Sequence, residues 1–168
     1  MGKVIILSGI SGSGKSTYAK DLLAKYNSKS KESGFYGGMV SADSFFLSDK
    51  GYNFDASKLG EAHGSCFRHF ISSLQDKNID LIIVDNTNTT AVEIAPYVLG
   101  AAAYNWNCEI VTIRTSDVRA CGDKNIHNVP ESSIAQQLDR LNKRVLPPYW
   151  KNTDVVLIVI KDEKSNPS

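Results

Sequence analysis

The sequence is poor in several features that would otherwise fix its function. It has three cysteines among 168 residues (Cys66, Cys108 and Cys121), and none forms a CxxC pair. This pattern excludes a disulfide framework, and it argues against a zinc site. We therefore expect a reducing, cytoplasmic location. The net charge is +1, from 19 basic and 18 acidic residues. The chain therefore lacks the large excess of positive charge that proteins use to bind long stretches of nucleic acid. This balance does not exclude a nucleic-acid partner that is contacted through only a few phosphates.

Long apolar runs are also missing. The first apolar run, residues 4–7, gives way at once to serine and glycine, so it is too short for a signal-peptide core or a membrane span. No other uninterrupted apolar run is long enough to span a bilayer, and we expect no membrane partner. The sequence shows no internal repeat and no low-complexity tract. Its length fits one domain, which we place at residues 1–168.

What the sequence does have is a regular alternation of short apolar runs and helical periodicities. The apolar runs predict strands at residues 4–7, 39–42, 81–84, 109–113 and 155–160. Helices are predicted after Lys15, over residues 59–74, from a capping box at Thr90 and Glu93, and from Pro130. The last helix is expected to place Ile134, Leu138, Leu141 and Val145 on one face, and residues 49–55 read as a turn-rich linker. The predicted fold class is α/β: a three-layer P-loop NTPase fold, with a five-stranded parallel sheet, helices on both faces, and a helical lid at roughly residues 116–144.

A phosphate-binding loop lies between the first strand and the first helix. Residues 9–16 read GISGSGKS and fit the pattern GxxxxGK[ST] in the structural context that the motif requires. Its backbone amides and the following helix N-terminus can bind the phosphates of ATP. We expect Lys15 to reach the β- and γ-phosphates and Ser16 to bind Mg²⁺. The other predicted nucleotide contacts are Gly12, Ser13, Gly14 and Thr17.

Two aspartates are expected at the carboxyl ends of neighbouring strands, where ligands of such folds bind. Asp85 ends an apolar strand and is predicted to organise the magnesium ion; the alternative is a residue that caps the next turn. Asp43 follows the second strand. In a small kinase, a carboxylate there can accept the proton of the acceptor hydroxyl. The alternative for Asp43 is a helix N-cap.

Basic residues gather in and after the polar segment that follows the fourth strand. Cationic side chains on a mobile lid often stabilise the charge of a transferring phosphoryl group. Arg119 and Lys124 are candidates for this role, Arg140 is a candidate nucleotide contact, and Arg144 lies on the same predicted helix. Each of them can instead be a solvated surface charge. His127 either orients the lid or contacts the substrate.

Several segments in order resemble a known family. The sequence carries GxSGSGKST, SxDxFF, FDxxxLxxAH, VDNTN and NxHxVP, from Gly9 to Pro130. This pattern resembles the polynucleotide 5′-hydroxyl kinase branch of the P-loop kinases, which includes the AAA-type kinase domain of phage end-healing enzymes. The resemblance implies ATP-dependent, Mg²⁺-dependent phosphorylation of the 5′-OH end of DNA or RNA. It also implies that Asp43 is the general base and that Asp85 organises the site.

The sequence departs from that family at two positions. Lys124 stands where the family's lid usually carries an arginine, and a lysine cannot form a bidentate fork on phosphate. Phe46 stands where the phage enzymes carry an arginine for the phosphate next to the acceptor. Phe46 can stack on a terminal base or belong to the core, and Arg68 is a substitute candidate for the phosphate contact.

Three functions fit these observations. The favoured hypothesis is a polynucleotide 5′-hydroxyl kinase. The second is a P-loop kinase that acts on a small molecule such as a nucleoside, a sugar or an antibiotic. The third is a nucleotide-binding module without catalysis. The chain lacks a second His-x-Thr/Ser motif and an Asp-x-Asp-Gly-Thr segment, so we expect neither cyclic phosphodiesterase nor phosphatase activity.

Overall fold

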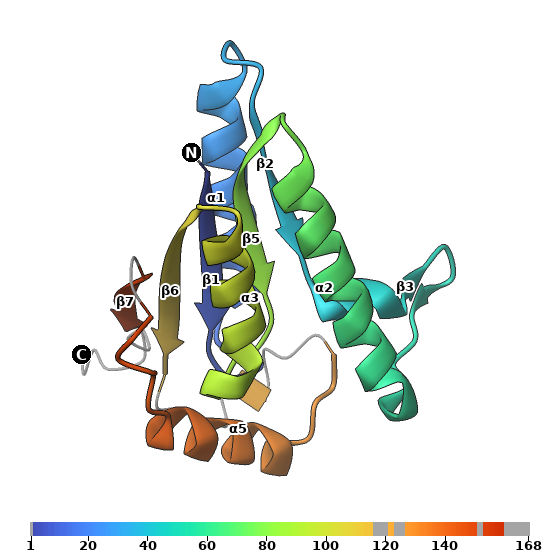
Figure 1. Cartoon of the computed structure of the whole chain (residues 1–168). Helices are drawn as coiled ribbons and strands as arrows, with labels where there is room; N and C mark the ends of the chain where they lie inside the picture. The colour runs from blue at the N-terminus through green and yellow to red at the C-terminus, as the bar shows by residue number, and fades with distance from the viewer. Residues whose placement is uncertain (1, 116–120, 123–126, 151–152, 160–168) are drawn as a thin grey trace, which may run out of the picture.

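A computed structural model describes residues 2–115, 121–122, 127–150 and 153–159. Its central feature is a parallel sheet with the strand order β2-β5-β1-β6-β7 (Figure 1). The strands are β1 (Lys3–Ser8), β2 (Tyr36–Val40), β5 (Ile79–Asp85), β6 (Asn107–Arg114) and β7 (Thr153–Val159). The predicted α/β fold with a five-stranded parallel sheet is therefore confirmed.

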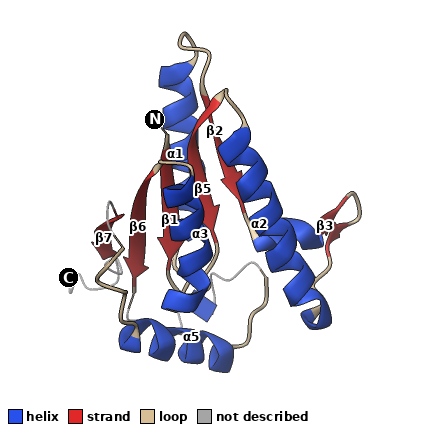
Figure 2. Ribbon diagram, viewed as in Figure 1, coloured by secondary structure: helices blue, strands red, loops and turns tan. Residues whose placement is uncertain are grey.

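Helices cover both faces of the sheet. One face carries α1 (Lys15–Ser30), and the other carries α2 (Leu59–Gln75) and α3 (Ala91–Ala103), as Figure 2 shows. Successive residues of β1 point to opposite faces, so Val4 and Ile6 pack in the α2/α3 core while Ile5 and Leu7 pack in the α1 core. Each such buried side chain stabilises the fold by about 1.5–3 kcal/mol. The sheet is thereby held rigidly enough to fix the loops at its carboxyl edge.

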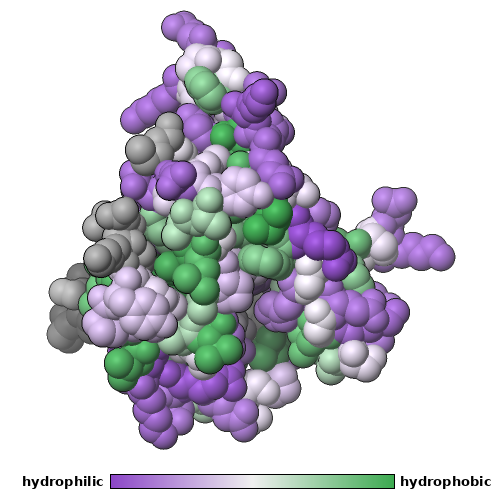
Figure 3. Space-filling view, in the orientation of Figure 1, coloured by the Kyte–Doolittle hydropathy of each residue, from purple (hydrophilic) through white to green (hydrophobic). Residues whose placement is uncertain are grey.

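Helix α5 (Glu131–Lys143) lies across that carboxyl edge, within residues 116–144, the segment predicted to act as a lid and called the lid below. Ile134 and Leu141 are buried against Ile10 of the phosphate loop and against Cys121. The opposite surface of α5 is hydrophilic, at the bottom of the view in Figure 3. Val145 does not share the apolar face as predicted, because the helix ends at Lys143 and leaves its side chain 81% exposed.

Strands β1, β5 and β6 extend one or two residues beyond their predicted ends, and larger differences lie at β2, at residues 49–55 and at the last strand. Strand β2 begins at Tyr36 rather than at residue 39, because the pair Gly37-Gly38 lies inside the strand. It ends at Val40, and the residues after it form the 3₁₀ helix η1 (Ala42–Phe46). The predicted linker at residues 49–55 contains a short antiparallel hairpin of β3 (Leu47–Ser48) and β4 (Gly51–Tyr52), which precedes η2 (Ala56–Lys58). The last predicted strand is already present at Thr153, earlier than expected, and is described through Val159.

None of the helices in the described residues combines the length and the apolar character needed to cross a membrane.

Candidate active site

The phosphate loop joins β1 to α1 and depends on two glycines with positive φ. Gly14 caps α1 with φ 94°, and Gly12 lies in the loop with φ 78°. A Cβ atom on Gly12 would lie 2.1 Å from the carbonyl oxygen of Cys121. Only glycine fits this position, because both the backbone conformation and the close approach of the Cys121 segment exclude a side chain. The loop is thus packed directly beneath the lid.

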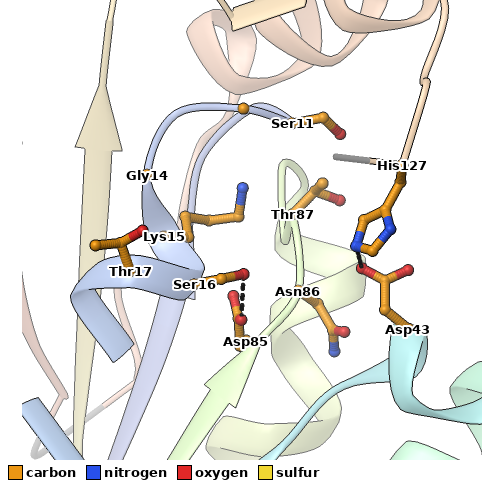
Figure 4. Close-up of a pocket in the computed structure, with 11 residues that line it drawn as sticks. Ser11, Gly14, Lys15, Ser16, Thr17, Asp43, Asp85, Asn86, Thr87 and His127 are labelled. Atoms are coloured by element: carbon orange, nitrogen blue, oxygen red, sulfur yellow. Dashed lines mark hydrogen bonds and ion pairs between the residues drawn. The ribbon is translucent and has the colours of Figure 1, made fainter. Parts of the chain in front are cut away.

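Lys15 and Ser16 stand at the end of this loop and are the first two residues of helix α1 (Figure 4). The Lys15 ammonium is buried and donates a hydrogen bond to the carbonyl oxygen of Ile10 at 2.7 Å. Burial lowers the pKa of Lys15 to about 8, against the opposing effect of Asp85 and Asp43. The loop therefore holds a desolvated cation where an anionic ligand would stabilise its charge.

Asp85 ends β5 beside Ser16, whose hydroxyl donates to Asp85 Oδ2 at 2.7 Å. Burial raises the pKa of Asp85, while the bond from Ser16 and the charge of Lys15 oppose that rise. The predicted magnesium ion fits this pair, because hydroxyl and carboxylate oxygens are hard ligands. No group of three His, Cys, Asp or Glu in the described ranges could hold a metal by itself. Ser16 and Asp85 would therefore share the ion with the oxygens of a bound nucleotide.

Asp43 stands at the start of η1, with its side chain half exposed. Ser41 caps this helix by accepting a hydrogen bond from the Asp43 amide at 3.2 Å, so Asp43 is not the N-cap residue. Tyr52 donates from its hydroxyl to Asp43 Oδ1 at 3.2 Å, and His127 Nε2 lies 3.3 Å from Asp43 Oδ2. The Tyr52 and His127 rings stack with centroids 4.2 Å apart. Burial, assisted by Asp43, raises the pKa of Tyr52 to about 12, so its hydroxyl keeps the proton it donates.

Asn86 follows Asp85 in the chain and is hydrogen-bonded to the segment that carries Asp43. The sequence alone indicated no role for it. Its Oδ1 accepts a hydrogen bond from the Ala42 amide at 2.9 Å. Its Nδ2 lies 3.4 Å from the hydroxyl of Tyr97 and 3.6 Å from the sulfur of Cys66. The end of β5 thereby fixes the start of η1 and the position of Asp43. The feature of the sequence that could have indicated this role is a side-chain amide directly after Asp85, at the end of a buried strand.

Two cavities meet at Asp43. The smaller one, about 240 Å³, is lined by Ser11, Gly12, Gly14, Lys15, Ser16, Thr17 and Asp85. The larger one, about 590 Å³, is lined by aromatic and apolar residues of the η1–α2 region and by polar residues of the lid. Asp43, Asn86, Thr87 and His127 line both of them. One carboxylate therefore faces both a phosphate-binding space and a second, wider space.

The predicted nucleotide contacts do not all line the smaller cavity. Ser13 is buried beneath the loop, where its amide donates to the Ile10 carbonyl at 3.2 Å. Arg140 lines the larger cavity and donates from Nε to Thr89 Oγ1 at 3.2 Å. Arg119 and Lys124 lie outside the described residues. The nucleotide contacts predicted for Ser13 and Arg140 stay predictions.

Arg144 and Arg68 line neither cavity, whereas Phe46 is a buried part of the wall of the larger one. Arg144 lies under the loop and donates to Ser8 Oγ, to the Asn88 carbonyl and to Thr112 Oγ1, so it holds the carboxyl edge of the sheet together. Phe46 is 6% exposed and packs edge-on against Phe54 and Tyr52, so it belongs to the core beneath the larger cavity. Arg68 is exposed on α2 and lines neither cavity.

Comparison with known proteins agrees with this geometry. A protein-family model described as an AAA domain matches residues 4–144. The chain belongs to this AAA-domain family. It is a P-loop kinase-like nucleotide-binding domain. Human NEDD4-binding protein 2 is 30% identical over 158 residues, which make up 90% of this chain but 8% of the human protein. The chain therefore spans a small part of that relative.

Solved structures with the same fold act on different molecules. Kti12 of Chaetomium thermophilum, solved with ADP-AlF3, has a TM-score of 0.62 at 14% identity, over 96% of this chain and 91% of that one. A fungal RNA kinase has a TM-score of 0.60 at 13% identity, over 99% and 77% of the two chains. The Mycobacterium tuberculosis APS kinase, in complex with AMPPNP and APS, has a TM-score of 0.56 at 18% identity, over 94% and 88%. These likenesses establish the fold and leave the acceptor open.

Proposed function

We propose that the chain is an ATP-dependent polynucleotide kinase that transfers the γ-phosphate to the 5′-hydroxyl end of DNA or RNA. The observation that carries this proposal is the position of Asp43 at the junction of the two cavities. Lys15 and Asp43 line the same cavity, so a triphosphate bound at Lys15 can extend its terminal phosphate toward Asp43. An acceptor hydroxyl in the larger cavity then has the Asp43 carboxylate beside it.

The reaction requires one bond to form and one to break. The 5′-oxygen attacks the γ-phosphorus, the bond from that phosphorus to the β,γ-bridging oxygen breaks, and ADP leaves. The hydroxyl proton passes to Asp43, while Lys15 and the loop amides stabilise the negative charge on the phosphoryl oxygens. When bound at Ser16 and Asp85, Mg²⁺ would neutralise part of the phosphate charge.

The lining of the larger cavity supports a nucleic-acid end rather than a small polar alcohol. Tyr52, Phe54 and Leu59 give it an apolar and aromatic wall, and every nucleobase offers a face that stacks on such a wall. The resemblance of the sequence segments to polynucleotide kinases points to the same acceptor.

The test is transfer of labelled γ-phosphate with Mg²⁺ to a 5′-OH oligodeoxynucleotide, to a 5′-OH oligoribonucleotide, and to a panel of nucleosides, sugars and aminoglycosides. We expect 5′-phosphorylated oligonucleotide, and no product from an oligonucleotide whose 5′ end is already phosphorylated. Asp43→Asn serves as the control against a contaminating kinase. Turnover of a small alcohol alone would instead support a small-molecule kinase. ATP binding without product on any acceptor would support a non-catalytic module.

A further inference from the structure

The larger cavity contains one strongly basic side chain. Arg140 is the only lysine or arginine among the described residues that line it. Ser133, Gln137 and Arg140 share one face of α5, because they are spaced by four and three residues, and all three line the cavity. Gln137 accepts a hydrogen bond from the Ser11 amide of the phosphate loop at 2.8 Å. This bond ties α5 to the loop and sets the position from which Arg140 reaches the acceptor side.

A hydrogen bond from Nε holds one side of the Arg140 guanidinium in place. Its Nε donates to the hydroxyl of Thr89, and Thr89 is fully buried. The amide of Thr89 donates to Glu93 Oε2 at 2.7 Å, and its hydroxyl lies 3.4 Å from the same oxygen. Glu93 also lines the cavity, but this carboxylate is engaged by the backbone at the start of α3. The chain Glu93–Thr89–Arg140 therefore fixes the orientation of the guanidinium.

The terminal nitrogens of Arg140 remain available to a ligand. Within the described residues its one hydrogen bond is the bond from Nε, and it forms no ion pair there. The two terminal nitrogens of a guanidinium form a planar fork that matches two oxygens of a phosphate group. The larger cavity thus combines an apolar wall, the Asp43 carboxylate and an oriented cationic fork.

We propose that Arg140 binds the phosphate on the 3′ side of the acceptor nucleoside, and so makes the chain prefer nucleic-acid ends to free nucleosides. This inference rests on the proposed function. A polynucleotide end differs from a nucleoside by that phosphate, so a cation on the acceptor side is what can distinguish them. Phe46 is buried and Arg68 lines neither cavity, which leaves Arg140 as the described arginine in reach of the acceptor.

The test compares three acceptors that share one base and differ in phosphate: a 5′-OH oligonucleotide, the nucleoside 3′-monophosphate and the nucleoside. For Arg140→Gln we expect kcat/KM to fall about ten- to hundredfold with the first two acceptors, the range for a charge-assisted hydrogen bond. The rate with the nucleoside and the KM for ATP should stay within about twofold. Arg140→Lys should be intermediate, because it keeps the charge but loses the fork.

The salt dependence supplies a second readout. Each phosphate contact on a single strand contributes about 0.7 to the slope of log(kcat/KM) against log salt, so Arg140→Gln should lower the slope for the oligonucleotide by about that amount. Lys143→Gln is the matched control: Lys143 lies on the same helix, is exposed, and does not line the cavity. It should leave acceptor preference unchanged.

Any one of four results would overturn the inference. An equal loss on all three acceptors would assign Arg140 a purely structural role. A raised KM for ATP with unchanged acceptor preference would place it on the nucleotide. An unchanged variant, in a chain that does phosphorylate oligonucleotides, would remove Arg140 from recognition while leaving the proposed function standing. If the wild-type chain phosphorylates no oligonucleotide, the proposed function and this inference fall together.

Discussion

Apart from Asp85 and its neighbours after β5, the residues around Lys15 come from one continuous stretch of chain, whereas the residues around Asp43 come from separate segments. The phosphate loop runs without interruption from β1 into α1, and its hydrogen bonds to Ile10 are local. Asp43 belongs to η1, Tyr52 to the hairpin, Asn86 to the end of β5, and His127 to the lid. The donor side is thus a local motif, and the acceptor side exists only once the chain has folded around it.

This difference has a consequence for function. The donor side retains its shape as long as β1 and α1 are packed, so nucleotide binding should survive changes elsewhere. The acceptor side depends on contacts between elements, so it should respond to changes at each of them. The following predictions separate the two sides, beginning with the largest expected effect.

Asp43→Asn should abolish most turnover and spare nucleotide binding. The variant keeps the shape of the side chain but cannot accept the hydroxyl proton. A general base contributes about 10²- to 10⁴-fold, so kcat should fall by about that factor. Calorimetric affinity for a non-hydrolysable ATP analogue should stay within about twofold. Asp49→Asn, an exposed aspartate in the hairpin turn, is the control. A matching loss of nucleotide affinity in the Asp43 variant would show that the two sides are not separable.

Nucleotide affinity should weaken as pH rises above about 8. Lys15 has a pKa of about 8 because it is buried, and a bound triphosphate raises that pKa. Below pH 8 the lysine is charged both with and without ligand, so affinity is constant. Above it, binding takes up a proton, and affinity falls by up to about tenfold per pH unit.

Calorimetry in two buffers with different ionisation enthalpies would measure this proton uptake at pH 9. In Lys15→Met the uptake should disappear, and the residual affinity should no longer vary with pH in this range. The same uptake in wild type and variant would mean that another group titrates. Asp43→Asn should retain the dependence but move its onset to lower pH, because the charge of Asp43 raises the pKa of Lys15.

Asn86→Ala should loosen the acceptor side and destabilise the fold. It leaves the Ala42 amide without its partner in a buried position, which costs about 1–3 kcal/mol. Chemical denaturation should show this loss, and kcat for phosphoryl transfer should fall while ATP-analogue affinity holds. The control is Asn53→Ala, because Asn53 is an exposed asparagine in the segment that follows β4. A stability loss without any change in kcat would mean that Asn86 does not position Asp43.

The same contrast explains what the sequence alone could predict. The sheet and the phosphate loop follow from local patterns: apolar runs mark the buried strands, and the spacing from Gly9 to Ser16 marks the loop. The capping box was also read correctly, since Thr90 accepts a hydrogen bond from the Glu93 amide at 3.2 Å. Each of these features depends on residues that are neighbours in the chain.

The acceptor side could not be predicted in the same way. Strands of two residues have no periodicity, so the hairpin that carries Tyr52 read as a linker. Gln137 and Asn86 are ordinary amides until the fold brings them to Ser11 and Ala42. Arg140 was one lid cation among several, and its distance from the phosphate loop depends on how α5 crosses the sheet.

Tyr52→Phe should give the smallest effect and the finest test of the comparison. The variant removes one hydrogen bond to Asp43 but keeps the ring that stacks on His127. This hydrogen bond goes to a half-exposed carboxylate, so it should contribute at the low end of the range for bonds to charged groups, about 1.5 kcal/mol, and kcat/KM for the acceptor should fall about tenfold. Tyr36→Phe is the matched control, since Tyr36 donates a similar bond to Asp76 at 3.0 Å, away from both cavities. Because the Tyr52 hydroxyl orients the carboxylate from the hairpin, its loss should affect the acceptor reaction and leave nucleotide affinity unchanged. An equal effect of the two variants would mean that the hairpin contributes stability alone, and that the lid and β5 position Asp43 without it.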